Sequence, residues 1–229
     1  MMMKEFKTLP ISTQTVMAYI NCKFNIENIE NNLEYINIPN LTENDLRTIK
    51  GKHGCIYQIK GPNLTKGVPA KKGHFRNQIT IKIFIIDKIV TVKIFRTGKF
   101  HMTGCKNLKY HQSAATTLLN KIRSIHTEEH PTFEIEDTDP LNIILEVVMT
   151  NIDFKIDFDI DQIALDSLIQ ETGEHDFYTV FETTINTSVN VKMDYKDPEE
   201  KIYDQIIFKN KKLEYTTTNK CPKSKEKET

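Results

Sequence analysis

The sequence is poor in the residue patterns that mark disulfide frameworks, zinc sites and membrane segments. It has four cysteines without any CxxC spacing, at Cys22, Cys55, Cys105 and Cys221. No apolar run approaches the length of a membrane span, and the methionine-rich start lacks the apolar core of a signal peptide. We therefore expect a globular protein of a reducing compartment, with no membrane partner.

Motifs of catalysis are also missing. The seven histidines have no HExxH spacing, and the sequence has neither a GxSxG motif nor a phosphate-binding glycine loop. The acidic run DFKIDFDID at 153–161 allows a metal site, but its alternation favours a solvated strand face. We expect no enzyme, no cofactor and no metal.

Charge is distributed very unevenly, although the formal net charge is zero. Residues 1–125 hold 20 Lys and Arg against 7 Asp and Glu, a net charge of +13, and residues 126–229 hold 11 against 24, or −13. A basic half favours contact with phosphates, and an acidic half favours protein or water. Two differently charged solvated faces are the simpler alternative.

The first half contains three strands with period-two alternation. Gln78–Ile86 and Lys88–Arg96 each place Ile and Val on one face, and Lys99–Thr103 follows a Thr-Gly turn. This pattern predicts an antiparallel sheet packed on one side only. A helix over Asn107–Ile125 then carries one apolar stripe, with Asn107 as its cap.

Upstream, Val16–Phe24 alternates as a strand, and we expect a short helix over Asn25–Leu33 and a brief strand near Tyr35–Ile38. Residues 60–76 form a loop with five positive charges and no negative one.

The second half resembles the first in its order of elements. After an acidic linker at 126–142, a strand over Ile143–Phe158 and a helix follow; the helix carries Ile160, Ile163, Ala164, Ser167 and Leu168 on one face. Further strands are expected at Phe177–Thr183, Thr187–Tyr195 and Lys201–Phe208. We predict two degenerate repeats, 1–125 and 143–229, the second divergent and incomplete.

One segment carries a family resemblance. VKIFRTGKFHMTGCK, at Val92–Lys106, is similar to the signature of TATA-box-binding proteins: a strand ending in Ile-Phe, a turn with Gly-Lys, a strand, and Thr-Gly-Cys-Lys before a long helix. Cys22-Lys23-Phe24 matches the end of the family's opening strand. The sequence at 59–77 resembles the divergent family members encoded by nucleocytoplasmic large DNA viruses.

The resemblance implies an α+β saddle, a curved antiparallel sheet whose concave face lies in the DNA minor groove and whose helices cover the convex face. Binding of this kind opens the groove with apolar wedges and kinks the duplex. The family's wedges match Phe75 and Phe95. The other residues expected at the DNA are Thr13, Thr15, Lys82, Lys93, Arg96, Thr97, Lys99, His101 and Thr103.

Simpler interpretations of these residues stay open. Phe75 is otherwise a loop anchor, Phe95 an incidental surface aromatic, and Arg96 and Lys99 solvated charges. Lys82 and Lys93 make the face more cationic than is usual in the family. They favour salt-sensitive duplex binding over strict TATA specificity.

The function that the resemblance implies is transcription initiation on AT-rich promoter DNA, with a TFIIB-type factor or RNA polymerase as protein partner. Its location would be the host nucleus or a cytoplasmic virus factory, or the virion. The alternative is a degenerate platform that binds such a factor or a viral RNA polymerase without binding DNA.

Overall fold

The computed structural model describes residues 10–38, 40, 42, 44–47, 50–63, 65–67, 76–135, 140–152, 159–172, 177–181, 189–193, 201–209 and 212–220. They form two compact units, one of Met1–Asp153 with Ile202–Thr229 and one of Phe154–Lys201. Within the described chain, no helix is both long and apolar enough to span a membrane.

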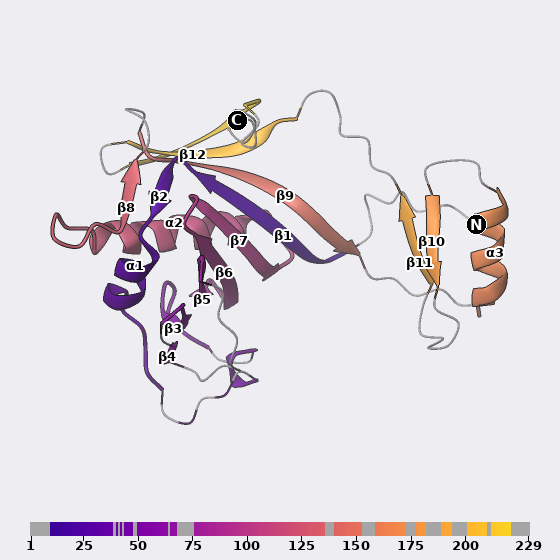
Figure 1. The fold of residues 1–229 in the computed structure, drawn as a ribbon, viewed down its shortest axis with the longest axis horizontal. Coiled ribbons are helices and arrows are strands. Elements are labelled where there is room, and N and C mark those ends of the chain that lie inside the picture. Colours follow the sequence, from indigo (N-terminus) through magenta and orange to yellow (C-terminus); the bar gives the residue numbers. More distant parts are fainter. Residues whose placement is uncertain are drawn as a thin grey trace. The chain divides into compact units, whose positions relative to one another are not determined.

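The first unit is built around a nine-stranded sheet in the order β13-β12-β9-β1-β7-β6-β5-β3-β4 (Figure 1). Every neighbouring pair is antiparallel. The strands are β1 (Ile11–Ile20), β3 (Ile56–Lys60), β4 (Thr65–Gly67), β5 (Gln78–Ile85), β6 (Lys88–Phe95), β7 (Lys99–Cys105), β9 (Asn142–Ile152), β12 (Tyr203–Lys209) and β13 (Lys212–Thr218).

The unit also holds a two-stranded sheet and its helices. They are β2 (Cys22–Phe24) paired with β8 (Phe133–Ile135), α1 (Ile26–Asn32), the 3-10 helix η2 (Asp45–Arg47) and α2 (Leu108–Ser124). The second unit consists of α3 (Gln162–Thr172) and the hairpin of β10 (Phe177–Phe181) with β11 (Val189–Met193).

The core lies on one face of the large sheet, as the alternation predicted. The Ile and Val side chains of β5 and β6 that share this face are fully buried, and α2 packs on β7, β1, β5 and β6. Leu118 and Ile122 of α2 and Ile26 and Ile29 of α1 belong to the same apolar cluster. Burial of these side chains, worth about 1.5–3 kcal/mol each, is the main force that holds both helices on the sheet.

The turn between β6 and β7 needs its glycine. Gly98 has φ +78°, and a β-carbon there would collide with the backbone carbonyl oxygens of Cys22 and Ile20. The Gly98 carbonyl accepts a 2.7 Å hydrogen bond from the Ile20 amide. The Thr-Gly-Lys element of the signature therefore fastens the end of β1 to the β6–β7 turn.

The second glycine of the signature redirects the chain. Gly104 has φ +99°, and the pairing of β1 with β7 shifts register between Gln14 and Val16. Cys105, two residues after the open-face Thr103, is fully buried in the core as a result. Burial raises the pKa of this thiol to about 11, so it stays protonated at neutral pH. Asn107 then caps α2, its side chain accepting from the Lys109 amide at 2.9 Å, as predicted.

Several expectations for other segments were wrong. The predicted strand Val16–Phe24 begins at Ile11 and is interrupted at Asn21, and Tyr35–Ile38 is irregular instead of a strand. The 60–76 loop starts with strand residues: Lys60 ends β3, and β4 lies inside it. Strand β8 lies inside the expected linker, and β13 follows where no strand was expected.

The fold class is α+β with a mostly antiparallel sheet, as expected. In the second half, β9 pairs with β1 and β12 pairs with β9, so both halves contribute to one sheet. Helix α3 and the β10–β11 hairpin belong to the other compact unit. The saddle and the two-repeat division stay predictions.

Candidate nucleic-acid interface

The face of the sheet opposite α2, here called the open face, collects most of the predicted DNA-binding residues. On β5, β6 and β7 it carries the residues that alternate with the buried Ile, Val, Phe and Met. On β1 the alternation assigns it Thr13, Thr15, Met17 and Tyr19, because Val16, Ala18 and Ile20 face the core.

Strand pairing aligns these residues in rows across the sheet. One row runs in the order Lys60, Thr80, Lys93, His101, Met17 and Glu146. A second runs in the order Gln58, Lys82, Thr91 and Thr103. A third runs in the order Gln78, Phe95, Lys99, Tyr19, Ile144 and Gln205.

Each of four adjacent strands, β3, β5, β6 and β7, contributes one lysine to the open face: Lys60, Lys82, Lys93 and Lys99. Neighbouring strands lie about 4.8 Å apart, so the four strands span roughly 14 Å. Threonine hydroxyls lie between the lysines at Thr80, Thr91 and Thr103. The face therefore presents ammonium and hydroxyl donors over an area that suits phosphate oxygens and the acceptors of a groove.

Phe95 lies on the open face, where the wedge hypothesis needs it. Its ring is half-buried, whereas the neighbouring Ile94 is fully buried in the core on the other side. Phe95 pairs with Gln78 on one side and with Lys99 on the other, at the end of the strands beside the β6–β7 turn.

At the opposite end of the strands the open face is closed by a small apolar cluster. Leu46 of η2 packs with Tyr57 and Phe84, and Ile89 lies against them. Three of the lysines (Lys60, Lys82 and Lys93) and the threonines lie between this cluster and the row that holds Phe95 and Lys99. This arrangement bounds the interface along the strand direction.

The setting of His101 favours its neutral form. Burial lowers its pKa, and the charge of Lys93, its partner across β6 and β7, lowers it further. A neutral imidazole offers one donor and one acceptor, whereas the lysines only donate.

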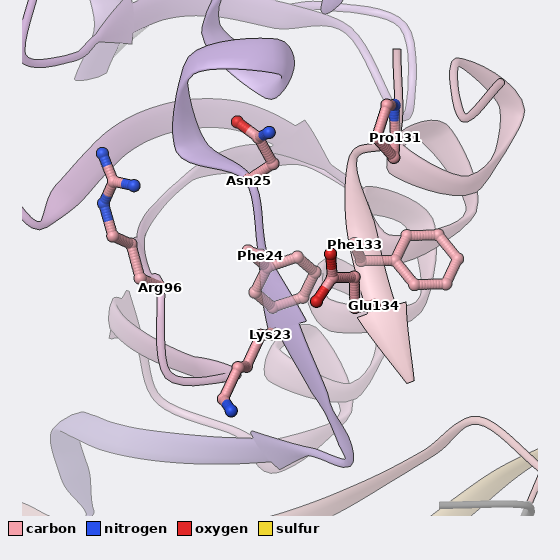
Figure 2. Close-up of a pocket in the computed structure, with 7 residues that line it drawn as sticks. All are labelled: Lys23, Phe24, Asn25, Arg96, Pro131, Phe133 and Glu134. Carbon is pink, nitrogen blue, oxygen red and sulfur yellow. The ribbon is translucent and has the colours of Figure 1, made fainter. Parts of the chain in front are cut away.

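Arg96 and Thr97 lie in the β6–β7 turn and not on the open face. Both side chains are exposed, and the Arg96 guanidinium is 3.4 Å from the Glu27 carboxylate. Figure 2 shows Arg96 at one side of a pocket of about 200 Å³, with Glu134 on the other side of Phe24. The pocket is lined by Lys23, Phe24, Asn25, Arg96, Pro131, Phe133 and Glu134.

The predicted site thus divides into three groups. The open face brings together Thr13, Thr15, Lys82, Lys93, Phe95, Lys99, His101 and Thr103. Arg96 and Thr97 lie beside this group, in the turn. Phe75, the other expected wedge, lies outside the described residues.

Sequence reasoning missed the acidic end of the open face. Glu146 of β9 is buried beside β1, opposite Met17, and accepts a 2.9 Å hydrogen bond from the Tyr19 hydroxyl. The Lys99 ammonium lies 5.8 Å from the centre of the Tyr19 ring. The charge of the face therefore changes sign between β7 and β9. The alternation of β9 could have revealed Glu146, since its neighbours Ile143 and Leu145 face the core.

In the part of the chain that the structure describes, no group of three His, Cys, Asp or Glu side chains could hold a metal ion.

The geometry defines an α+β protein with helices on one sheet face and a cationic opposite face, and its relatives are viral. The chain is 24% identical over 207 residues to an uncharacterized protein, 335L, of Invertebrate iridescent virus 6, covering 81% of this chain and 60% of that protein. It is 29% identical over 116 residues to a TATA-box-binding protein-like protein of Acanthamoeba polyphaga mimivirus, covering 47% of this chain and 31% of that protein.

The chain spans less than two thirds of the length of either relative. No family model matches it. Over about half of its length, the chain is similar to a viral TATA-box-binding-protein-like protein, as the signature segment predicted.

Proposed function

We propose that this protein is a viral transcription-initiation factor of the TATA-box-binding type, whose open face binds promoter duplex DNA in the minor groove. The observation that carries the proposal is the alignment of four lysines, interspersed threonines and the half-buried Phe95 on the sheet face away from α2. The similarity to the mimivirus protein supports the transcriptional assignment.

The chemistry of the face suits a bent, AT-rich duplex. In the minor groove, A·T pairs present only acceptors, which lysine and threonine donors can satisfy, whereas G·C pairs add an amino donor that a lysine cannot accept. Phe95 at the end of the strands acts as the wedge that unstacks a base step. The cost of unstacking, a few kcal/mol per step, is offset by the contact surface that the bend creates.

The charge distribution supports DNA binding to only one part of the open face. The lysines occupy β3, β5, β6 and β7, whereas β9 brings Glu146 to the same face. A carboxylate accepts but does not donate, so it repels both phosphates and the acceptors of A·T pairs. DNA therefore lies over the first-half strands and ends near β1.

A salt titration of duplex binding tests the proposal. Fluorescence anisotropy of a labelled 20-base-pair AT-rich duplex should show binding at low salt and a steep linear fall of log affinity against log salt concentration, because bound phosphates release counterions. A GC-rich duplex of equal length is the control and should bind more weakly. Absence of binding to both duplexes at 20 mM salt would refute the proposal.

A second candidate function is a protein platform for a TFIIB-type factor or a viral RNA polymerase. Glu146 on the open face, with its Tyr19 hydrogen bond, is the observation that favours it, because a buried acid there disfavours DNA. The two functions differ in the titration: a platform shows no duplex binding at any salt concentration, and its open face stays available to protein.

A further inference from the structure

Helix α3 exposes apolar side chains along its outer side. Ile163 is 64% exposed and Leu168 57% exposed, and Ile160, just before the helix, is 44% exposed. Ala164 and Ser167 lie between Ile163 and Leu168 on the same side and are exposed too. These five residues are here called the α3 stripe; the sequence predicted that they share one helix face.

The other side of α3 already has a neighbour, the hairpin of its own unit. The helix packs on β10 and β11 (Figure 1). Leu165 and Ile169 are half-buried, in contrast to the stripe. A helix with apolar residues on both sides requires a second covering layer. Among the residues of this unit that the structure describes, one helix and one hairpin, nothing supplies that layer.

The charge around the stripe selects the covering partner. Residues 159–172 contain Asp159, Asp161, Asp166 and Glu171 and no Lys, Arg or His. The whole unit, Phe154–Lys201, has 12 Asp and Glu against 4 Lys and no Arg. A second copy of the stripe would bring like charges together, and nucleic acid would be repelled.

We propose that the α3 stripe is a docking surface for a basic amphipathic helix of a partner protein. The partner's apolar side chains cover Ile163 and Leu168, and its Lys and Arg side chains meet Asp159 and Glu171 at the rim. The small side chains of Ala164 and Ser167 let the two helices approach closely. The surface is distinct from the open face, so the proposal goes beyond DNA binding and does not depend on it.

A matched pair of peptides tests this surface on the full chain. The probes are an 18-residue amphipathic helix of Leu and Lys and its counterpart of Leu and Glu, both labelled and measured by fluorescence anisotropy. We expect the Leu–Lys peptide to bind and the Leu–Glu peptide not to bind. The double variant Ile163→Ser, Leu168→Ser should weaken Leu–Lys binding by at least about tenfold, since two apolar contacts are lost.

The controls separate the stripe from general acidity. Ile202→Ser removes an isoleucine that is 75% exposed elsewhere and should leave peptide binding unchanged. The double variant keeps every acidic residue, so equal binding by variant and wild type would overturn the proposal. Failure of the Leu–Lys peptide to protect α3 amides from hydrogen exchange would overturn it as well. Duplex binding, measured on the same samples, reports on the proposed function separately.

Discussion

Neutralising the cations of the open face should flatten the salt dependence of DNA binding. The variant replaces Lys82, Lys93, Arg96 and Lys99 with Gln. Three of these residues lie on the open face, whereas Arg96 lies in the turn beside Glu27. Each phosphate contact contributes about 0.9 to the slope of log affinity against log salt concentration, so three contacts contribute about 2.7.

A slope difference of about 2.7 has a visible effect on affinity. Between 50 and 200 mM salt, wild type should lose roughly 40-fold more affinity than the variant, as anisotropy titrations at four salt concentrations would show. The matched control replaces Lys201, Lys209, Lys211 and Lys212. Among these, Lys209 is 2.8 Å from the Glu214 carboxylate and already neutralised locally. If the control set lowers the slope as much as the first set, the assignment of DNA to the first half is wrong.

Three further predictions address the wedge, the turn and a buried histidine. Phe95→Ala should reduce duplex bending, read as energy transfer between end labels, more than it reduces attachment; unchanged transfer would count against a wedge. Gly98→Ala should destabilise the fold by at least about 2 kcal/mol in urea unfolding, because its β-carbon meets backbone carbonyls. Gly54→Ala is the control: Gly54 is equally left-handed, but a β-carbon there meets only side chains, so this substitution should cost less. Burial lowers the pKa of His111 to about 4, below its unfolded value near 6.5, so the stability that its neutral form provides is complete above pH 6.5 and is lost as pH falls to 4. Wild type should lose roughly 3 kcal/mol more than His111→Leu between pH 7 and 4; parallel losses would show that another group titrates.

The strands of the first half could be predicted because one face of each is buried. Gln78–Ile85 and Lys88–Phe95 lie within a residue of their expected ends, since Ile and Val alternate until a turn interrupts them. Strand β3 gave no such signal. Its core residues are Ile56 and Ile59, and a register shift between Ile56 and Gln58 breaks the alternation.

The wrong strand near Tyr35–Ile38 has a local explanation. The segment is irregular: the Ile36 amide donates a 2.7 Å hydrogen bond to the Ile56 carbonyl, but no ladder forms. Apolar residues at alternate positions predict an extended segment, and they do not report whether a partner strand pairs along its length.

The α3 helix shows a different limit. Its apolar face was predicted correctly as a set of residues, yet the structure leaves that face exposed and packs the other side on the hairpin. Periodicity identifies which residues share a face and carries no information about what covers it. In the candidate site the same limit applies to Glu146, whose position beside Tyr19 depends on the pairing of β1 with β9, more than 120 residues apart.

That pairing places β1, the first strand of the described residues, in the interior of the sheet. β1 pairs with β7 on one side and with β9 on the other, so neither partner has left the ribosome when β1 does. The sheet is therefore dominated by contacts distant in sequence, which slow folding. A chain that stopped before Asn142 would expose β1 as a ten-residue edge with free amides and carbonyls, open to pairing with other chains. β9 thus protects the protein from aggregation through that edge only once β9 itself has been synthesised and has paired with β1.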